Sequence, residues 1–231
     1  MHLMLGALLL AASAGSSWQA LAPGAERLRL EEDGLRLDLF RFDLTRYRPE
    51  VVVLGPERPR AASALRADTG AVAVVNGGFF DEQWRSLGLR IAGGKTVIGL
   101  RPRVDWGVLV VREGRAQIVH SREFRADPGI LQAIQVGPRL LAAGQPMKLK
   151  PQSARRTAVA LDREGRTLTL VIADAPASAQ RVAEALARLG FDAALMFDGG
   201  PSTQLAIELG ELRLSLPGGY AVPDALMIRR R

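Results

Sequence analysis

Two apolar segments of the sequence each end in a polar side chain that is followed by two glycines. "AVAVVNGGFF" (71–80) leads into Asn76, and "AALMFDGGPSTQL" (193–205) leads into Asp198. An amide and a carboxylate at strand ends can hold or polarise a ligand. The glycines permit positive φ, let a ligand approach the main chain, and can align N–H groups that bind an anion. Because the pattern occurs twice, we expect the two strand ends to meet at one cleft.

Both segments have an alternative interpretation as hairpin turns, because Asn-Gly and Asp-Gly are strong type I′ signals. The flanking residues disfavour it. Pro201 cannot donate to a strand ladder two residues after Gly199, and "GFFDEQW" (78–84) lacks the alternation of a returning strand. Ser202 would then cap the next segment or bond the ligand.

The residue types that are missing narrow the chemistry further. There is no cysteine, which removes thiol nucleophiles, disulfides and thiolate metal sites. Of the two histidines, His2 lies in a segment that we expect to be removed. His120 alone excludes a multi-histidine zinc site, and its place at the end of "RAQIVH" favours an ordinary surface residue over a triad base. Carboxylates, amides, hydroxyls and arginines must do the chemistry.

The formal net charge of +7 comes almost entirely from arginine, since lysine occurs only at Lys95, Lys148 and Lys150. No run of basic residues is interleaved with aromatic ones, which disfavours nucleic-acid binding. An anionic small substrate or glycan suits scattered arginines better, because each can hold a phosphate or carboxylate with two parallel hydrogen bonds.

The N-terminal residues 1–20 have the pattern of a secretory signal peptide. An apolar stretch from Leu3 to Ala12 precedes Ala12-Ser13-Ala14, a small-x-small cleavage site, and we expect cleavage near 14–20. The alternative is a buried or amphipathic N-terminal helix. No later segment approaches the roughly 20 apolar residues of a membrane span. We therefore expect an exported protein, periplasmic or secreted, with one domain over 21–231 and an oligomeric state that the sequence leaves open.

The elements that must position the polar residues are mostly strands. Period-two alternation or continuous apolar runs predict strands at 26–32, 35–43, 50–55, 71–75, 87–100, 131–147, 205–214 and 225–228. Hairpins are expected over 106–120 and 155–174, and helices over 58–70 and 177–192. The fold class is α+β: one domain with a mixed, largely antiparallel sheet and a few flanking helices.

Four motifs occur together in a characteristic order: "NGGFFD", "AIQVGPRLL", "RRTAVALDREG" and "LGFDAALMFDGGPST". In these motifs the sequence resembles the phosphodiester glycosidase family, in particular its bacterial exported branch. The resemblance spans Val72 to Thr203. One departure is Pro201, where the family's animal member has glycine, so the animal substrate is not carried over.

The resemblance implies cleavage of the glycosidic C1–O bond of a sugar-1-phosphodiester. Glycosidases commonly use two carboxylates. A departing phosphomonoester is already a stable anion, so a cation that neutralises its growing charge matters more than acid help. Asp198 would face the anomeric carbon, Asp81 would be the second carboxylate, Arg156 would hold the phosphate, and Asn76 would hydrogen-bond sugar hydroxyls.

The same resemblance implies further substrate-binding residues, which are Asn76, Gly77, Gly78, Phe79, Gly137, Thr157, Gly199, Gly200 and Ser202. Ordinary structural roles remain open: Asp198 as a cap, Arg156 as an ion-pair partner, and Trp84 and Trp106 as packing residues rather than sugar platforms.

Two rival functions remain. One is a phosphodiesterase that cleaves the P–O bond, and the other is a non-catalytic envelope module that binds an anionic glycan. Asp174 is a reserve carboxylate at another strand end. A divalent cation between Asp198, Asp81 and Asp174 is conceivable because hard cations favour carboxylate oxygens, but no loop has EF-hand spacing and no cofactor is assigned.

Overall fold

The computed structural model describes residues 17–102 and 104–231. The predicted signal peptide therefore lies outside the described residues, apart from its last four positions. Three antiparallel sheets and two short α-helices form one body, which confirms the α+β class. Every strand pair in the described part of the chain is antiparallel.

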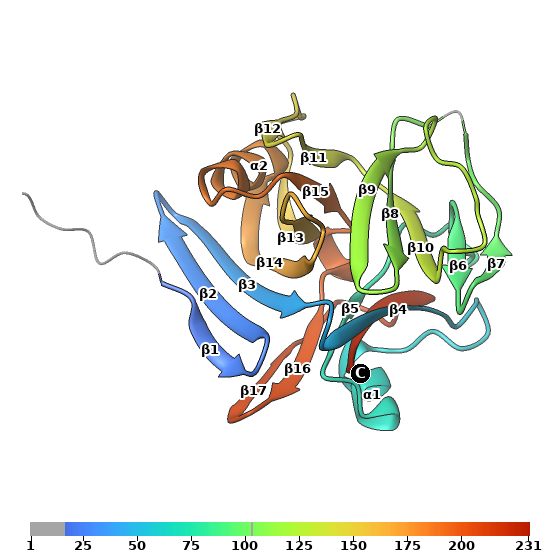
Figure 1. Cartoon of the computed structure of the whole chain (residues 1–231), viewed down its shortest axis with the longest axis horizontal. Helices are drawn as coiled ribbons and strands as arrows, with labels where there is room; N and C mark the ends of the chain where they lie inside the picture. Colours follow the sequence, from blue (N-terminus) through green and yellow to red (C-terminus); the bar gives the residue numbers. More distant parts are fainter. Residues whose placement is uncertain (1–16, 103) are drawn as a thin grey trace, which may run out of the picture.

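Figure 1 shows the three sheets around a common centre. The eight-stranded sheet consists, in spatial order, of β1 (Gln19–Ala22), β2 (Ala25–Glu32), β3 (Leu35–Asp43), β14 (Thr167–Ser178), β13 (Ser153–Leu161), β15 (Ala193–Met196), β11 (Arg139–Ala142) and β12 (Gln145–Pro146). The β8 sheet consists of β7 (Lys95–Ile98), β6 (Arg90–Ala92), β10 (Gln132–Val136), β8 (Gly107–Arg112) and β9 (Arg115–His120). The β5 sheet consists of β17 (Leu212–Leu216), β16 (Leu205–Leu209), β5 (Ala73–Asn76), β18 (Asp224–Arg230) and β4 (Tyr47–Val53).

Local patterns predicted most strands correctly, whereas their grouping was not foreseen. The hairpins β8–β9 and β13–β14 turn where the sequence places them, around Gly114 and Gly165. The strands on either side of Gly137-Pro138 enter different sheets, β10 the β8 sheet and β11 the eight-stranded sheet. The segment 205–214 is a hairpin rather than one strand, because Gly210 adopts a φ of 60° between β16 and β17.

The helices α1 (Ala62–Thr69) and α2 (Ala179–Arg188) cover outer faces of the sheets (Figure 1). The α2 helix begins where the Ser178 hydroxyl accepts a hydrogen bond from the Arg181 N–H, as predicted from the sequence. Its face with Val182 and Leu186 packs on the eight-stranded sheet. The α1 helix ends at Gly70, which is in the left-handed region with a φ of 63°, and packs on the β5 sheet.

The main core fills the space between the three sheets. Phe42 from the eight-stranded sheet, Val75 from the β5 sheet and Leu109 from the β8 sheet are fully buried in the same cluster. Phe197, directly after β15, is buried with them. This shared core fixes the relative position of the sheet ends that carry the polar motifs.

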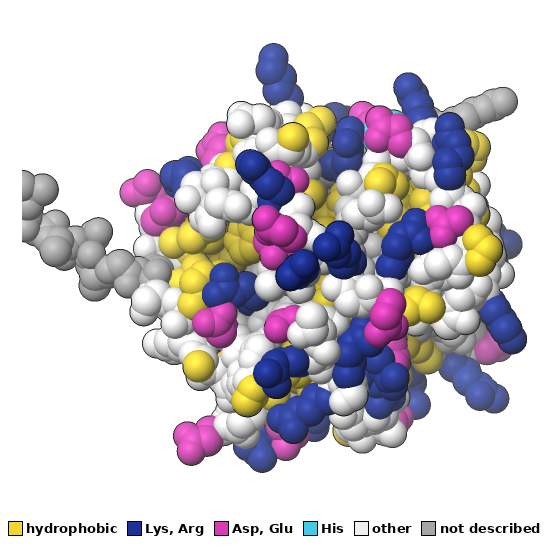
Figure 2. Space-filling model, in the orientation of Figure 1, with side chains coloured by type: hydrophobic (Ala, Val, Ile, Leu, Met, Phe, Trp, Pro, Cys, Tyr) yellow, Lys and Arg dark blue, Asp and Glu magenta, His cyan; other side chains and the backbone are white. Residues whose placement is uncertain are grey.

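The basic side chains do not form one continuous patch on the face shown in Figure 2, where acidic side chains lie beside many of them. Fifteen arginine–carboxylate ion pairs account for many of the charges in the described residues. Within 17–102 and 104–231, no helix has the length and apolar character needed to cross a bilayer.

The turns of two hairpins interlock where the eight-stranded sheet meets the β8 sheet. The Gly165 carbonyl accepts a hydrogen bond from the Ala116 N–H at 2.8 Å. A methyl group on Gly165 would overlap with the Ala116 carbonyl oxygen, whereas one on Gly114 would meet nothing within 4 Å. Both glycines have a φ of 63°, so they differ only in their surroundings.

We therefore expect Gly114→Ala to lower the free energy of unfolding by about 1 kcal/mol, through the positive φ alone. Gly165→Ala should cost about 1–3 kcal/mol more, because it also forces the two turns apart. Urea unfolding of both variants measures the difference. Equal losses would contradict the interlocked arrangement of the turns.

Candidate active site

The two strand ends meet, as the repeated motif predicts. Asn76 closes β5, and its Nδ2 donates to the Asp198 main-chain oxygen at 2.8 Å. Its Oδ1 accepts from the Thr157 hydroxyl, which lies on β13, at 2.7 Å. Asn76 and Thr157 are both fully buried. The Asn76 side chain thus joins the β5 sheet to the eight-stranded sheet and holds the loop that carries Asp198.

The Asp198 carboxylate is held in one orientation by its own loop. Its Oδ1 accepts from the Gly199 N–H at 2.9 Å, and its Oδ2 accepts from the Ser202 hydroxyl at 2.5 Å. Burial raises the pKa of Asp198, and the nearby Asp224 carboxylate raises it further. The bonds from Ser202 and Gly199 act in the opposite direction but do not cancel the rise in pKa.

A buried ion pair, which the motif analysis missed, lies behind this loop. Arg90 of β6 donates from Nη2 to Asp224 Oδ2 at 3.0 Å, and neither side chain has any exposed surface. Asp224 opens β18, so the pair joins the β8 sheet to the β5 sheet. Its only sequence signal is a charged residue between Leu89 and Ile91 in an apolar stretch.

The Arg90–Asp224 ion pair explains why Gly77 and Gly78 are glycines. The sequence suggested that these glycines allow positive φ and the approach of a ligand, and this reason is not the one that the structure shows. Gly77 and Gly78 do not adopt positive φ. A methyl group on Gly77 would overlap with Asp224 Oδ1, and one on Gly78 would overlap with Arg90 Nη2. Their N–H groups donate to the Asp224 main-chain oxygen at 3.0 Å and to its Oδ1 at 2.8 Å. These glycines let the protein's own ion pair approach the main chain.

The second glycine pair fits the expectation in part. Gly200 has a φ of 59°, whereas Gly199 is extended. A methyl group on Gly199 would lie 2.9 Å from the Arg155 carbonyl oxygen and 3.7 Å from Nη1 of Arg156. The Arg156 guanidinium therefore lies against the loop that begins with Asp198.

Arg156 is a buried cation with neutral partners. The residue is 9% exposed, and it donates from Nε to the Ala177 carbonyl at 3.0 Å and from Nη2 to the Gln152 carbonyl. Its Nη1 lies 3.7 Å from the Met196 sulfur. Burial lowers the pKa of Arg156. No carboxylate pairs with it among the residues that the structure describes.

A cavity of about 470 Å³ brings together residues of all four sequence motifs, the fourth through Met196. Phe79, Gly137 and Arg156 line it, together with Pro138 and Trp106. The centres of the Trp106 and Phe79 rings are 5.0 Å apart. A methyl group on Gly137 would lie only 2.9 Å from Cδ1 of the Trp106 ring. Gly137 is therefore needed for the packing of Trp106 at the cavity wall.

An aromatic cluster lies on the Ser202 side of Asp198. The Tyr220 hydroxyl is 3.1 Å from the Ser202 hydroxyl. Tyr220 meets Phe80 and Trp84 edge-on, and those two rings stack on each other at 5.0 Å. Tyr220 is 40% exposed, so the cluster reaches the surface beside the carboxylate. No motif drew attention to Tyr220, which stands after two glycines in a loop.

The other candidate carboxylates have protein partners of their own. Asp81 accepts from the N–H groups of Gln83 and Arg85, each at 3.0 Å, and from Arg85 Nε at 2.8 Å. These hydrogen bonds lower the pKa of Asp81, and the bond from the Arg85 N–H has the largest effect. Asp174 pairs with Arg155 at 2.5 Å. Across 17–102 and 104–231, no group of three or more histidine or acidic side chains is placed to hold a metal ion.

His120 bonds Asp105 rather than any hydroxyl nucleophile. Its Nε2 lies 2.7 Å from Asp105 Oδ1, and its Nδ1 accepts from the Arg122 N–H at 3.1 Å. The proton of the neutral ring is therefore on Nε2.

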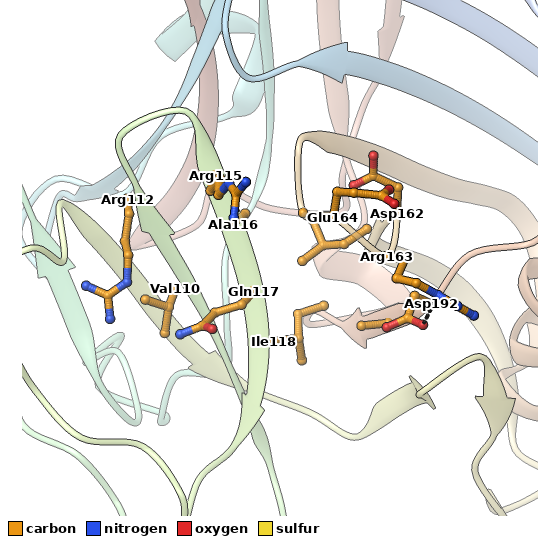
Figure 3. A pocket seen from close by; sticks show the side chains of 13 residues that line it. Val110, Arg112, Arg115, Ala116, Gln117, Ile118, Asp162, Arg163, Glu164 and Asp192 are labelled. Atoms are coloured by element: carbon orange, nitrogen blue, oxygen red, sulfur yellow. Dashed lines mark ion pairs between the residues drawn. The ribbon is translucent and has the colours of Figure 1, made fainter.

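A second hollow, of about 370 Å³, lies between the β8–β9 hairpin and the β13–β14 turn (Figure 3). Charges of both signs face it, and Arg163 lies 3.7 Å from Asp192 across part of it. The residues of the four motifs that line it, Leu161 to Gly165 and Asp192 to Ala193, are not those assigned to the site. The hollow is similar in size to the Arg156 cavity but lacks its buried unpaired cation.

Comparison with known proteins defines the class. A family model described as phosphodiester glycosidase matches residues 69–229. This range covers most of the chain and includes all four motifs. The chain belongs to the phosphodiester glycosidase family. A search of curated protein sequences finds no match.

Solved structures share the fold at low sequence identity. The catalytic domain of zebrafish N-acetylglucosamine-1-phosphodiester alpha-N-acetylglucosaminidase, auto-inhibited by its pro-peptide, matches with a TM-score of 0.72 and 17% identity over 94% of this chain and 88% of that one. A hypothetical protein from Synechocystis matches with a TM-score of 0.66 and 16% identity, over 96% and 65%. A Burkholderia pseudomallei protein described as exported matches with a TM-score of 0.64 and 14% identity, over 89% and 74%.

The Arg90–Asp224 pair yields a stability prediction. Asp224→Asn leaves the Arg90 charge buried without a counter-charge, which should lower the free energy of unfolding by about 3–5 kcal/mol. Asp68→Asn breaks the exposed pair with Arg60 and should cost less than about 1 kcal/mol. Urea unfolding compares the two variants. A loss in Asp224→Asn as small as the loss in Asp68→Asn would contradict the assigned role of the buried pair.

Proposed function

We propose that the protein is an exported hydrolase that cleaves the glycosidic C1–O bond of a sugar-1-phosphodiester. One observation carries the proposal: Arg156 is a buried cation without an acidic partner in the described residues, and it lines a cavity beside the Asp198 loop. A buried charge is stable only when it is paired or well hydrogen-bonded. An anionic phosphodiester in the cavity would supply the missing partner.

Asp198 is assigned to the anomeric carbon. The C1–O bond breaks toward an oxocarbenium-like state, which a carboxylate stabilises as nucleophile, as base for the attacking water, or by its charge. The bond electrons leave with the phosphate oxygen, and water adds to C1, giving free sugar and a phosphomonoester. Arg156 neutralises the charge that develops on the leaving oxygen. Ser202 and Gly199 hold Asp198 in place for this step.

The remaining motif residues are assigned from their contacts. Both polar atoms of the Asn76 side chain already bond protein groups, so we assign Asn76 to positioning the Asp198 loop rather than to direct contact with sugar hydroxyls. Thr157 supports Asn76. The cluster of Phe80, Trp84 and Tyr220 gives an amphipathic ring surface on which a sugar can stack beside the carboxylate. Asp81 orders the turn that carries Trp84.

The test is product analysis. The protein without its first 14 residues and its Asp198→Asn variant are incubated with a panel of sugar-1-phosphodiesters, with and without chelator, and NMR identifies the products. Free sugar and phosphomonoester from the wild type alone support the proposal. Sugar-1-phosphate would instead indicate a phosphodiesterase. Binding without turnover, equal in both proteins, would indicate a non-catalytic glycan-binding module.

Asp198→Asn should separate activity from stability. Because the pKa of Asp198 is raised above its ordinary value of 3.8, the stability linked to its proton is present below that value and is lost as the pH rises through the folded-state pKa. The amide removes this loss. At pH 7 the variant should therefore unfold at the same urea concentration as the wild type or a higher one, while turnover falls at least about 10³-fold.

The raised pKa of Asp198 also determines how the rate depends on pH in the acidic range. Wild-type activity should fall as the pH drops through the raised pKa of Asp198, which lies above 3.8. Urea midpoints at pH 4 and pH 7, together with the pH dependence of kcat/KM, check both expectations. A variant that is clearly less stable than the wild type at pH 7 would contradict the assignment of a buried, destabilising charge.

Two adjacent arginines provide a matched pair of variants. Arg156→Gln removes the proposed phosphate contact, and kcat/KM should fall about 10- to 100-fold, the effect of a hydrogen bond to a charged group. Arg155→Gln removes a cation that already pairs with Asp174, and kcat/KM should change less than about threefold. Steady-state kinetics on folded protein measures both. Equal losses would show that general charge, and not the cavity contact, matters.

Export also leads to a prediction. A fold neighbour is described as exported, and the sequence offers a cleavage site after Ala14. Cleavage there leaves β1 intact, which matters because Gln19 pairs with Arg27 and the Trp18 ring lies 4.1 Å from the Arg41 guanidinium carbon. The exported chain should therefore begin at Gly15, as mass spectrometry of the secreted fraction would show. A chain that begins after Gln19 would contradict this.

A further inference from the structure

The cavity beside Arg156 has more positive charge than a phosphodiester needs. Lys148 and Lys150 line it together with Arg156, so two of the protein's three lysines are at this one place. Both lysines are exposed at the loop between β12 and β13. Neither forms an ion pair within the described residues, whereas arginines elsewhere, such as Arg112 and Arg155, pair with carboxylates.

Among the described residues, Asp105 is the only acidic one that lines the cavity, and it forms no ion pair with either lysine. Its side chain is 88% exposed and bonds the Nε2 of His120 at 2.7 Å. Three basic side chains and one acidic side chain are thus found among the described residues that line the cavity. A phosphodiester carries one negative charge, which Arg156 can match. The two lysines are left to match a further negative charge on the ligand.

The walls of the cavity indicate what lies between the charges. Phe79 and Trp106 form an aromatic wall, and Leu149 and Met196 add apolar surface. A volume of about 470 Å³ accepts a ring-sized group. The leaving group would thus place a ring against the aromatic wall and an anionic substituent at the lysines.

We propose that the phosphomonoester that leaves is doubly anionic: its phosphate is esterified to a sugar-sized ring that itself carries a second phosphate or a carboxylate. This inference rests on the proposed function, in which the leaving group occupies the Arg156 cavity. It narrows the substrate class from phosphodiesters with one charge to phosphodiesters with at least two. Phosphate and carboxylate share the chemistry that the lysines recognise, so the experiment must distinguish them.

The experiment uses three diesters of one sugar that differ only in the second alcohol on the phosphate, which is a neutral hexose, the same hexose bearing a phosphate, or the corresponding hexuronate. Of the two substrates with an additional charge, we expect the better one to have a kcat/KM about tenfold above that of the neutral-hexose diester at low ionic strength, as two exposed ion pairs allow. The preference should shrink at 0.5 M salt. Whichever of these two substrates has the higher kcat/KM shows whether the lysines recognise a phosphate or a carboxylate.

Lysine variants test the origin of the preference. The double variant Lys148→Gln/Lys150→Gln should lose the preference but still cleave the neutral-hexose diester. Lys95→Gln, which removes the third lysine on β7, should keep the preference. Equal cleavage of all three diesters by the wild type would overturn this inference and leave the proposed function intact. A preference that survives in the double variant would also overturn it.

Binding keeps the test decisive if no diester is cleaved. Calorimetric titration of the three intact diesters into the wild type would then show whether the charged ones bind about tenfold more tightly, and whether that difference disappears in Lys148→Gln/Lys150→Gln. Tighter binding without cleavage would support an anionic ligand and reject the hydrolase. Equal binding of all three would overturn the inference.

Discussion

The ion pair between Arg90 and Asp224 is the contact on which the centre of the molecule depends. Removing both charges from water is costly, and the cost is met only because the partners are 3.0 Å apart and further bonds surround them. Arg90 also donates from Nη1 to the carbonyls of Leu89 and Gln135. Asp224 accepts from the main chain after β5. One interaction thus fixes two sheets and the Asn76 strand end to which the Asp198 loop is bonded.

Two of the buried arginines, Arg90 and Arg156, are in opposite electrostatic situations. Arg90 has a carboxylate, and its position serves the architecture. Arg156 has two carbonyl oxygens and a sulfur, none of which carries a formal charge. Such an arrangement is costly for the free protein, because desolvation is not repaid by a counter-ion. A charged ligand that entered the cavity would recover part of that cost, and the proposed function depends on this.

Short-range pattern predicted the strands, the hairpin turns and the capped α2 helix, because those features depend on neighbours in sequence. It did not predict the division into three sheets, since β10 and β11 are adjacent in the chain but pair with strands far away. For the site, the motifs predicted that Asn76 and Asp198 would meet. Asp224 and Tyr220 were missed, because each acts across the fold with no local pattern around it.

The glycines after Asn76 have a consequence for how such sequences are compared. Gly77 and Gly78 are required by the folded protein's own charged core, and no bound molecule enters that explanation. A relative that had lost its reaction would still need both in order to fold. The two glycines after Asn76 are therefore explained by the architecture, and their presence in a sequence is by itself no evidence of activity.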